Sequence, residues 1–206
     1  MAIQRIDDLS SMHLDVLKEI GNIGSGNAAT SLADMLNIMV DITVPNVKLL
    51  EFNDAVEFLG GPENIVIGML VRLSGDISGM MLYVIQEAFA ANLARSILGK
   101  DKFSLMELDE MDSSLISEVG NIMSASYVNA IASLSGMFID ISVPSLCVDM
   151  AGAILSVPAI EFSQIGDKVL FIDDSFVMGD NEVRSNMILV PELDSLNKLF
   201  GTLGIQ

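Results

Sequence analysis

The sequence has few of the side chains that most often carry out chemistry. Its 206 residues include one cysteine, one histidine and no tryptophan. The cysteine, Cys147, cannot form an internal disulfide, and its apolar neighbours predict a small side chain buried in a strand. A Cys/His catalytic pair is disfavoured, and no group of residues has the spacing of a zinc site. We expect the histidine, His13, to be exposed in the first turn of a helix.

Basic residues are also scarce. The 10 lysines and arginines are outnumbered by 28 aspartates and glutamates, which gives a formal net charge of −18. Nucleic acid and anionic membranes are disfavoured as partners, because both attract basic surfaces. The longest apolar runs are too short to cross a bilayer, and we expect no secretory signal. These features predict a cytoplasmic protein that does not insert into a membrane.

Apolar residues are plentiful. They make up 51% of the sequence, against 18% for charged residues, so the chain can bury a sizeable core. We interpret most of the 14 methionines as core residues that fill irregular gaps. The alternative is an adaptable protein-binding surface.

Two local patterns resemble ligand sites but have simpler interpretations. Asp173, Asp174 and Asp180 lack the spacing of an EF-hand, and we interpret them as a solvated turn. The run GNIGSGN, starting at Gly21, resembles a phosphate-binding loop but is not followed by GK[ST]. It falls within a predicted helix, where small residues permit close helix packing.

The sequence is internally duplicated. Residues 18–47 align without gaps with residues 117–146, and a weaker match joins residues 82–99 to residues 187–204. Both copies end on Leu-Gly. A repeat of this kind indicates related structural units that bury a common core. We predict one domain over residues 1–206, made of two repeats at about 9–99 and 108–204.

Each repeat predicts a long helix, a strand, a hairpin and a short helix. The long helices are expected over 9–36 and 108–135, and the strands over 38–44 and 137–143, each ended by a proline. The hairpins pair 64–73 with 77–85 and 168–177 with 182–190. Segment 151–165 is predicted to be an inserted helix with no counterpart in the first repeat. The expected fold is α+β with pseudo-two-fold symmetry: two three-stranded units form one antiparallel six-stranded sheet, with two long helices packed against it.

Three polar residues of each long helix share one face, opposite the apolar stripe. They are Asp15, Glu19 and Asn22 in the first helix and Ser114, Glu118 and Asn121 in the second. The glutamate and asparagine lie three residues apart and are therefore neighbours on the helix surface. Such a face forms no deep pocket, but it can be offered to a large partner that brings its own cavity. The alternative is a merely solvated surface, which the second copy in register makes less favoured.

The pattern extends to a proline at a fixed distance. Asp/Ser-x3-Glu-x2-Asn-x22-Pro occurs twice, ending at Pro45 and Pro144. This motif is the signature of the CheC/CheX/FliY family of chemotaxis phosphatases, which the sequence resembles over nearly its whole length. Two intact motifs, with no FliN-like domain expected, make the resemblance strongest to the CheC-type members.

The resemblance implies a hydrolase that removes the aspartyl phosphate of CheY, a chemotaxis response regulator. By this resemblance, Glu19 and Glu118 would pair with the active-site lysine of CheY, while Asn22 and Asn121 would orient the attacking water. Asp15, Ser114, Pro45 and Pro144 would shape the site. The protein would need no cofactor or metal of its own, because the bound regulator supplies Mg²⁺. An acyl phosphate is already activated, so the main remaining task is to position a water.

Two alternatives stay open. One is a non-catalytic adaptor that binds CheY or the receptor deamidase CheD, and the other is a component of the flagellar switch. Residues 147–154 resemble the region through which family members dock CheD, with Asp149 as the polar contact. Because we expect no FliN-like domain, the switch component is disfavoured.

Overall fold

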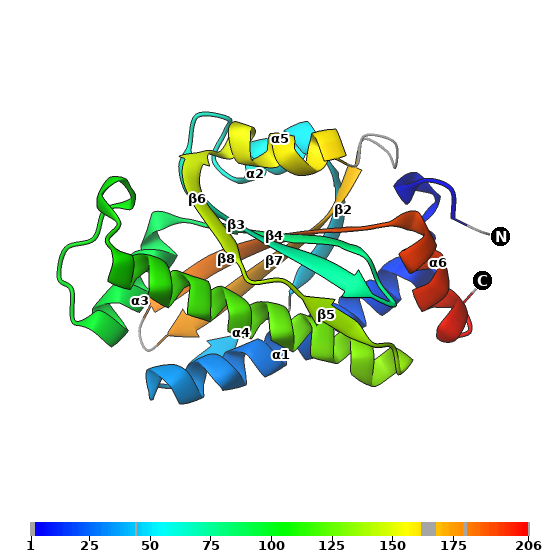
Figure 1. Ribbon diagram of the computed structural model, residues 1–206, viewed down its shortest axis with the longest axis horizontal. Helices are drawn as coiled ribbons and strands as arrows, with labels where there is room; N and C mark the ends of the chain where they lie inside the picture. The colour runs from blue at the N-terminus through cyan, green and yellow to red at the C-terminus, as the bar shows by residue number, and fades with distance from the viewer. Residues whose placement is uncertain (1–2, 44, 162–167, 179–180, 206) are drawn as a thin grey trace.

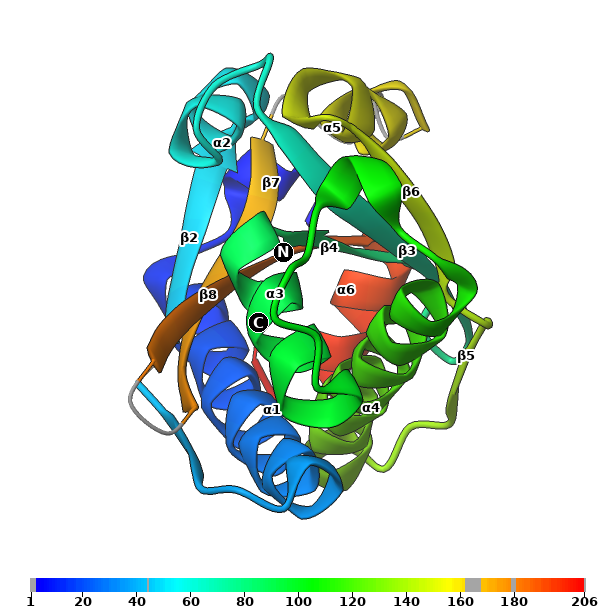
Figure 2. The ribbon, with the colours of Figure 1, turned by 90° about the vertical axis from the view of Figure 1, so that its left-hand side faces the viewer.

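The computed structural model describes residues 3–43, 45–161, 168–178 and 181–205, arranged in three layers (Figure 1). The long helices α1 (Ser11–Leu36) and α4 (Glu110–Ser135) cover one face of a curled antiparallel sheet. Helices α2 (Phe52–Phe58) and α5 (Ala151–Glu161) cover the other face (Figure 2). Helices α3 (Glu87–Leu98) and α6 (Leu193–Thr202) join the same apolar core as the long helices. The α+β class and the packing of two long helices on an antiparallel sheet are confirmed.

In the part of the chain that the structure describes, the sheet has eight strands rather than six. The strands are β1 (Val40–Ile42), β2 (Asn46–Glu51), β3 (Ile65–Gly75), β4 (Gly79–Ile85), β5 (Ile139–Ile141), β6 (Ser145–Met150), β7 (Lys168–Met178) and β8 (Asn181–Pro191). The strand order is β1-β7-β8-β4-β3-β5, with β2 also on β7 and β6 also on β3. The two additional strands arise because each motif proline interrupts a strand instead of ending it. Proline has no N–H for the ladder, but the chain resumes pairing with the same neighbour directly after it.

The two repeats exchange strands. β1 and β2 of the first repeat pair with β7 of the second, and β5 and β6 of the second repeat pair with β3 of the first. The central pair, β4 with β8, joins the two hairpins. The structure thus differs from the expected three-stranded unit within each repeat, because each such unit contains strands from both repeats. Each motif proline consequently lies between two strands that are held by the opposite repeat.

Both long helices begin in the same way. Each follows a short 3-10 helix, η1 (Ile6–Asp8) or η2 (Leu105–Glu107), and starts two residues later than predicted. Ser10 and Asp109 are the N-cap residues, and each side chain accepts a hydrogen bond from a backbone N–H of the first turn. The two helices have equal lengths, so residues 99 positions apart are structurally equivalent.

Helices α1 and α4 approach closely where α1 has a glycine. A Cβ atom on Gly24 would lie 2.7 Å from Cδ1 of Tyr127, closer than two carbon atoms can pack. The close helix packing predicted for the GNIGSGN run is therefore confirmed at this residue. The contact fixes α1 against α4, and with it the positions of the two polar faces.

Behind this contact lies a buried polar cluster. The Tyr127 hydroxyl donates to Oδ2 of Asp174 at 2.5 Å, and the Ser25 hydroxyl donates to Oδ1 at 2.7 Å. Asp174 is fully buried on β7, so the prediction that it lies in a solvated turn is wrong. Two hydroxyl donors from distant parts of the chain satisfy the carboxylate in the core. Asp180, which was assigned to the same turn, lies outside the described residues.

His13 and Cys147 also differ from expectation. His13 is buried, with its ring centroid 4.4 Å from that of Phe200 on α6, and this burial lowers the pKa of its imidazole. The prediction of an exposed histidine is wrong, because α6 covers the first turn of α1. Cys147 is exposed on β6, where the alternation of the strand turns it away from the core.

Helix α5 corresponds to the predicted inserted helix, but it has a counterpart in the first repeat. α2 follows β2 as α5 follows β6, and the two helices pack together over a second apolar core. The expectation of no equivalent is therefore wrong. Within the described residues, none of the helices is long and apolar enough to cross a membrane.

Candidate functional site

The first candidate face lies on the outside of α1. Asp15, Glu19 and Asn22 are all exposed, on the side of the helix that does not contact the sheet, as the helical wheel predicts. The side chain of Asp15 is 70% exposed and pairs with Lys18, whose Nζ donates to Oδ1 at 3.2 Å. The glutamate and the asparagine lie about one turn apart, so one partner surface can contact both.

The motif proline lies next to this face. Pro45 is buried, and a Cβ atom on Gly21 would lie 3.7 Å from its Cγ and 3.3 Å from Cγ2 of Val47. A larger residue at position 21 would push the strand away from the helix. The structure thereby brings Pro45 against the helical turn that carries Asn22, although 22 residues separate the two in the sequence.

The second candidate face lies on α4, and it borders an open hollow of about 540 Å³. All four residues of the second motif line this hollow, namely Ser114, Glu118, Asn121 and Pro144. Sequence reasoning missed the other lining residues, which are Ser113, Ser117, Ile141, Ser142 and Val143. Three of them directly precede the motif proline, and that position is the only sequence signal that marks them. Val143 is 84% exposed and forms an apolar wall at the edge of the hollow.

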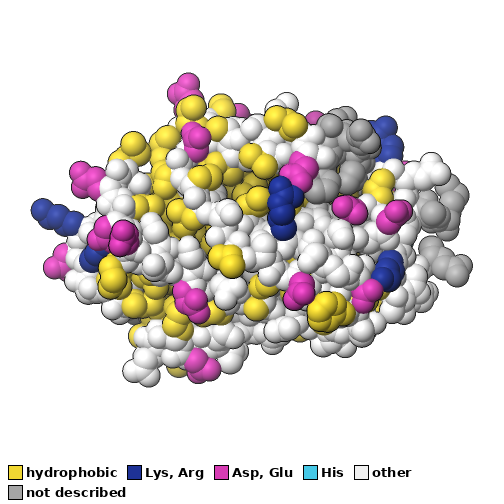
Figure 3. Space-filling model, viewed as in Figure 1, with side chains coloured by type: hydrophobic (Ala, Val, Ile, Leu, Met, Phe, Trp, Pro, Cys, Tyr) yellow, Lys and Arg dark blue, Asp and Glu magenta, His cyan; other side chains and the backbone are white. Residues whose placement is uncertain are grey.

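The two faces are alike in geometry but differ in charge. The first has Asp15 and Lys18 where the second has Ser114 and Ser117. Glu19 and Asn22 match Glu118 and Asn121, so the carboxylate and the amide are common to both. On the side of the molecule that carries α4, acidic and apolar side chains are interspersed and basic ones are few (Figure 3). A partner with a cation would complement the carboxylate that both faces share.

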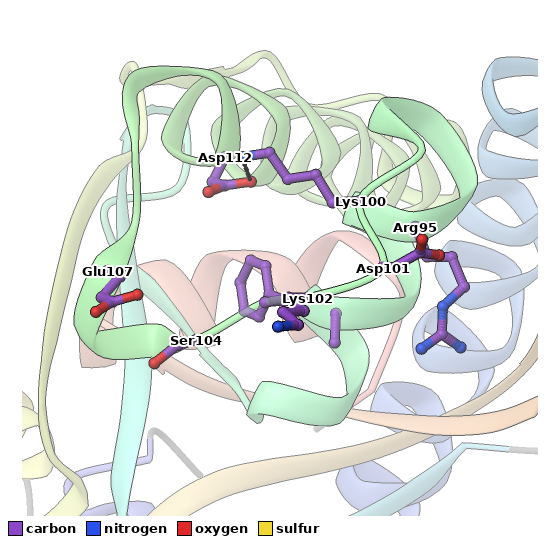
Figure 4. Close-up of a pocket in the computed structure, with 9 residues that line it drawn as sticks. Arg95, Lys100, Asp101, Lys102, Ser104, Glu107 and Asp112 are labelled. Atoms are coloured by element: carbon purple, nitrogen blue, oxygen red, sulfur yellow. Dashed lines mark hydrogen bonds and ion pairs between the residues drawn. The ribbon is translucent and has the colours of Figure 1, made fainter.

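A larger hollow, of about 770 Å³, contains none of the predicted site residues. It lies between the end of α3, residues 100–107 and the first turn of α4, and it is lined by both basic and acidic side chains (Figure 4). Lys100 reaches from it to Oδ2 of Asp109 at 2.6 Å and to Oδ1 of Asp112 at 2.7 Å. The ammonium of Lys100 lowers the pKa of Asp109 to about 2. We therefore assign Lys100, which lines this hollow, to anchoring the start of α4.

The carboxylate and amide of each face can do two things. The carboxylate can accept hydrogen bonds from a cation of the partner, and the amide can both accept from and donate to a water. Neither face encloses a small molecule, because the side chains project from a convex helix. The buried imidazole of His13 packs on Phe200 instead of joining the first face. The geometry therefore suits the binding of a macromolecule and the positioning of a water.

Comparison with known proteins finds a protein family whose model matches the two segments that carry the faces. The model of the CheC-like family matches residues 12–49 and 111–148, which are the equivalent parts of the two repeats. The chain is 36% identical over 195 residues to the CheY-P phosphatase CheC of Bacillus subtilis, covering 93% of each chain. It is 34% identical over 143 residues to the flagellar motor switch phosphatase FliY of the same organism, covering 69% of this chain and 37% of FliY.

The fold is shared with a solved relative. The crystal structure of Thermotoga maritima FliY superimposes with a TM-score of 0.76 and 23% sequence identity, covering 96% of this chain and 98% of that one. At this level of identity the similarity concerns the fold alone. Sequence and fold similarity thus cover nearly the whole of the described chain.

Proposed function

The chain belongs to the CheC-like family, and from that premise we propose that it hydrolyses the aspartyl phosphate of the response regulator CheY. The observation that carries the proposal is the exposed Glu/Asn pair, presented twice at the same spacing on equivalent helices. The name of its B. subtilis relative, a CheY-P phosphatase, supports the same substrate. We also propose a cytoplasmic location, which follows from this substrate.

In the proposed mechanism the protein supplies position rather than acid–base chemistry. Glu19 or Glu118 binds the active-site lysine of CheY, and Asn22 or Asn121 inserts beside the phosphoryl group. The amide holds a water in line with the phosphorus, and water attack releases phosphate and regenerates the aspartate of CheY. Phosphoryl transfer depends mainly on such alignment and on charge stabilisation, and Mg²⁺ bound to CheY supplies the latter. This protein needs no metal or cofactor for these steps.

The supporting residues of the motif act through the helix. Pro45 lies against the turn that carries Asn22, and Pro144 lines the hollow beside Asn121. Asp15 and Ser114 lie one turn before the glutamates and border the surface that CheY would cover. We therefore assign these four residues to shaping the two sites.

The direct test uses CheY labelled with ³²P on its aspartate. Adding the protein should accelerate the loss of label well beyond the spontaneous rate of CheY. The acceleration should disappear in EDTA, because the required Mg²⁺ belongs to CheY. Binding without acceleration would favour the non-catalytic adaptor over the phosphatase. Acceleration that persists in EDTA would contradict the positioning mechanism.

Replacing both glutamates should weaken the capture of CheY more than it slows the chemical step. In Glu19→Ala/Glu118→Ala, KM for phosphorylated CheY should rise about thirtyfold or more, because truncating one partner of a buried ion pair costs at least about 2 kcal/mol. The value of kcat should change much less. Steady-state kinetics with varied CheY-P measures both constants.

The matched control is Glu57→Ala, since Glu57 is exposed on α2 on the opposite side of the sheet. This variant should retain both constants of the wild type. An unchanged KM in the double variant would remove the glutamates from the docking role.

We propose CheD as a second partner, bound near the junction of β6 and α5. Asp149 is exposed there, and its Oδ1 accepts a hydrogen bond from the N–H of Met150 at 2.8 Å. The apolar side chain of Met150 next to it is exposed, and so are those of Val157 and Ile160 farther along α5. Calorimetric titration with purified CheD tests the assignment, which requires that Asp149→Lys weaken binding.

A further inference from the structure

An exposed methionine extends each Glu/Asn face by one helical turn. Met12 on α1 is 59% exposed and Met111 on α4 is 62% exposed. Met12, Asp15, Glu19 and Asn22 form the first stripe, and Met111, Ser114, Glu118 and Asn121 form the second. The spacing i, i+3, i+7, i+10 keeps all four side chains of a stripe on one side of the helix. Each stripe spans about 15 Å along its helix axis.

The methionine is retained where its neighbours have changed. Between the equivalent segments 10–15 (SSMHLD) and 109–114 (DEMDSS), the methionine is the only identical residue. Across these six positions the two repeats have therefore diverged everywhere except at this one. Retention of an exposed methionine beside five changed neighbours favours a shared role over mere solvation.

The other exposed methionines behave differently. Met39, Met106 and Met150 are 75%, 77% and 43% exposed. The residues at their equivalent positions are Phe138, Asp7 and Glu51. Exposed methionines are thus not generally preserved between the two repeats. The retention at 12 and 111 coincides with the stripes that carry the Glu/Asn pairs.

We propose that Met12 and Met111 are docking residues, each packing against an apolar part of the CheY surface beside its phosphorylated aspartate. This inference rests on the proposed function and extends the same two sites. With a net charge of −18, the protein offers little general attraction to an acidic partner. An apolar contact is independent of that charge, and the flexible thioether chain adapts to a surface that is not closely shaped to it.

The test compares two double variants. In Met12→Gln/Met111→Gln, which keeps the length of the side chain and removes its apolar end, KM for CheY-P should rise about tenfold, corresponding to about 1.4 kcal/mol. The value of kcat should stay within a factor of two, because the amide that positions the water is untouched. Binding should weaken by a similar factor when measured by calorimetry with CheY loaded with Mg²⁺ and beryllofluoride.

The matched control is Met39→Gln/Met106→Gln, which removes two exposed methionines that lie off the stripes. Both KM and binding should match the wild type in this control. An unchanged KM and affinity in the stripe variant would overturn the inference, and so would an equal loss in the control. A wild-type protein that does not accelerate phosphate loss would instead refute the proposed phosphatase, whatever the binding titration gives.

Discussion

The double variant Asn22→Ala/Asn121→Ala should lose nearly all of the acceleration of CheY dephosphorylation. If each amide holds the attacking water in line, removing both leaves the spontaneous rate of CheY. An acceleration of about a hundredfold corresponds to about 2.7 kcal/mol of transition-state stabilisation, which positioning of one water can provide. Each single variant should lose only part, because the other stripe still works.

This loss should appear in kcat, with little change in KM, since the glutamates that bind the CheY lysine remain. Folding should be preserved, because both asparagines are exposed and neither belongs to the apolar core. Far-ultraviolet circular dichroism and the urea midpoint verify this. Full activity in a folded double variant would exclude the proposed role of the amides.

Asn27→Ala provides the matched control. Asn27 is also exposed on α1, but five residues place it about 140° around the helix from Asn22. It should retain the wild-type rate. A comparable loss in this variant would mean that any truncation on α1 disturbs the protein, and the effect at Asn22 would then carry no mechanistic information.

The sequence sufficed to place the polar faces because helical periodicity is a local property. Glu19 and Asn22 are separated by three residues, so their common exposure follows once the helix is recognised. The duplication then gave a second, independent instance at Glu118 and Asn121. The proximity of Pro45 to Asn22 was only implied by the family resemblance, because it depends on how the strand returns along the helix.

The exchange of strands between the repeats could not be predicted from the sequence, because strand pairing is not a local property. The alternation of apolar residues in β1 or β5 tells which side is buried, but it does not tell which strand is the neighbour. The same motif sequence is compatible with pairing inside its own repeat or with the other one. Similarly, the proline was interpreted as the end of a strand, although an edge strand tolerates a proline and can resume after it.

Asp174 was misplaced because nothing near it in the sequence identifies its partners. An Asp-Asp pair between apolar residues looks like a turn, whereas its hydroxyl donors Ser25 and Tyr127 come from two different helices. A comparison with the equivalent strand position in the first repeat shows what is unusual about Asp174. Val47 pairs with Ile172 as the equivalent Leu146 pairs with Met69, so Asp174 occupies the place of Val71.

This buried carboxylate should make stability depend on pH. Burial is the main cause that raises the pKa of Asp174 to about 6, against its ordinary 3.8, and the hydrogen bonds from Tyr127 and Ser25 oppose the shift. Because the folded state holds the proton more tightly than the unfolded state, the contribution to stability is complete below about pH 4. It is lost as pH rises through about 6, and the total change is about 3 kcal/mol.

The variant Asp174→Asn cannot titrate at this position and isolates the effect. The difference in unfolding free energy, wild type minus variant, should fall by about 1.4 kcal/mol for each pH unit between 4 and 6, and level off above pH 7. Urea unfolding of both proteins across pH 4 to 8 measures it. Other carboxylates titrate in both proteins, so their contributions cancel in the difference.

The variant Tyr127→Phe provides a second test, in which the direction of the change in the pKa of Asp174 is predicted. Removing the Tyr127 hydroxyl deletes one of the two donors that stabilise the Asp174 carboxylate, so the folded-state pKa should rise further and the midpoint of the stability loss should move to higher pH. The neutral form of the carboxyl keeps Ser25 as a partner, so the destabilisation by Tyr127→Phe should be smaller at pH 5 than at pH 8. A difference between wild type and Asp174→Asn that stays constant over this range would show that the carboxyl does not change protonation in the folded protein. The cluster that joins α1, α4 and β7 would then be held by hydrogen bonds whose strength does not vary with pH.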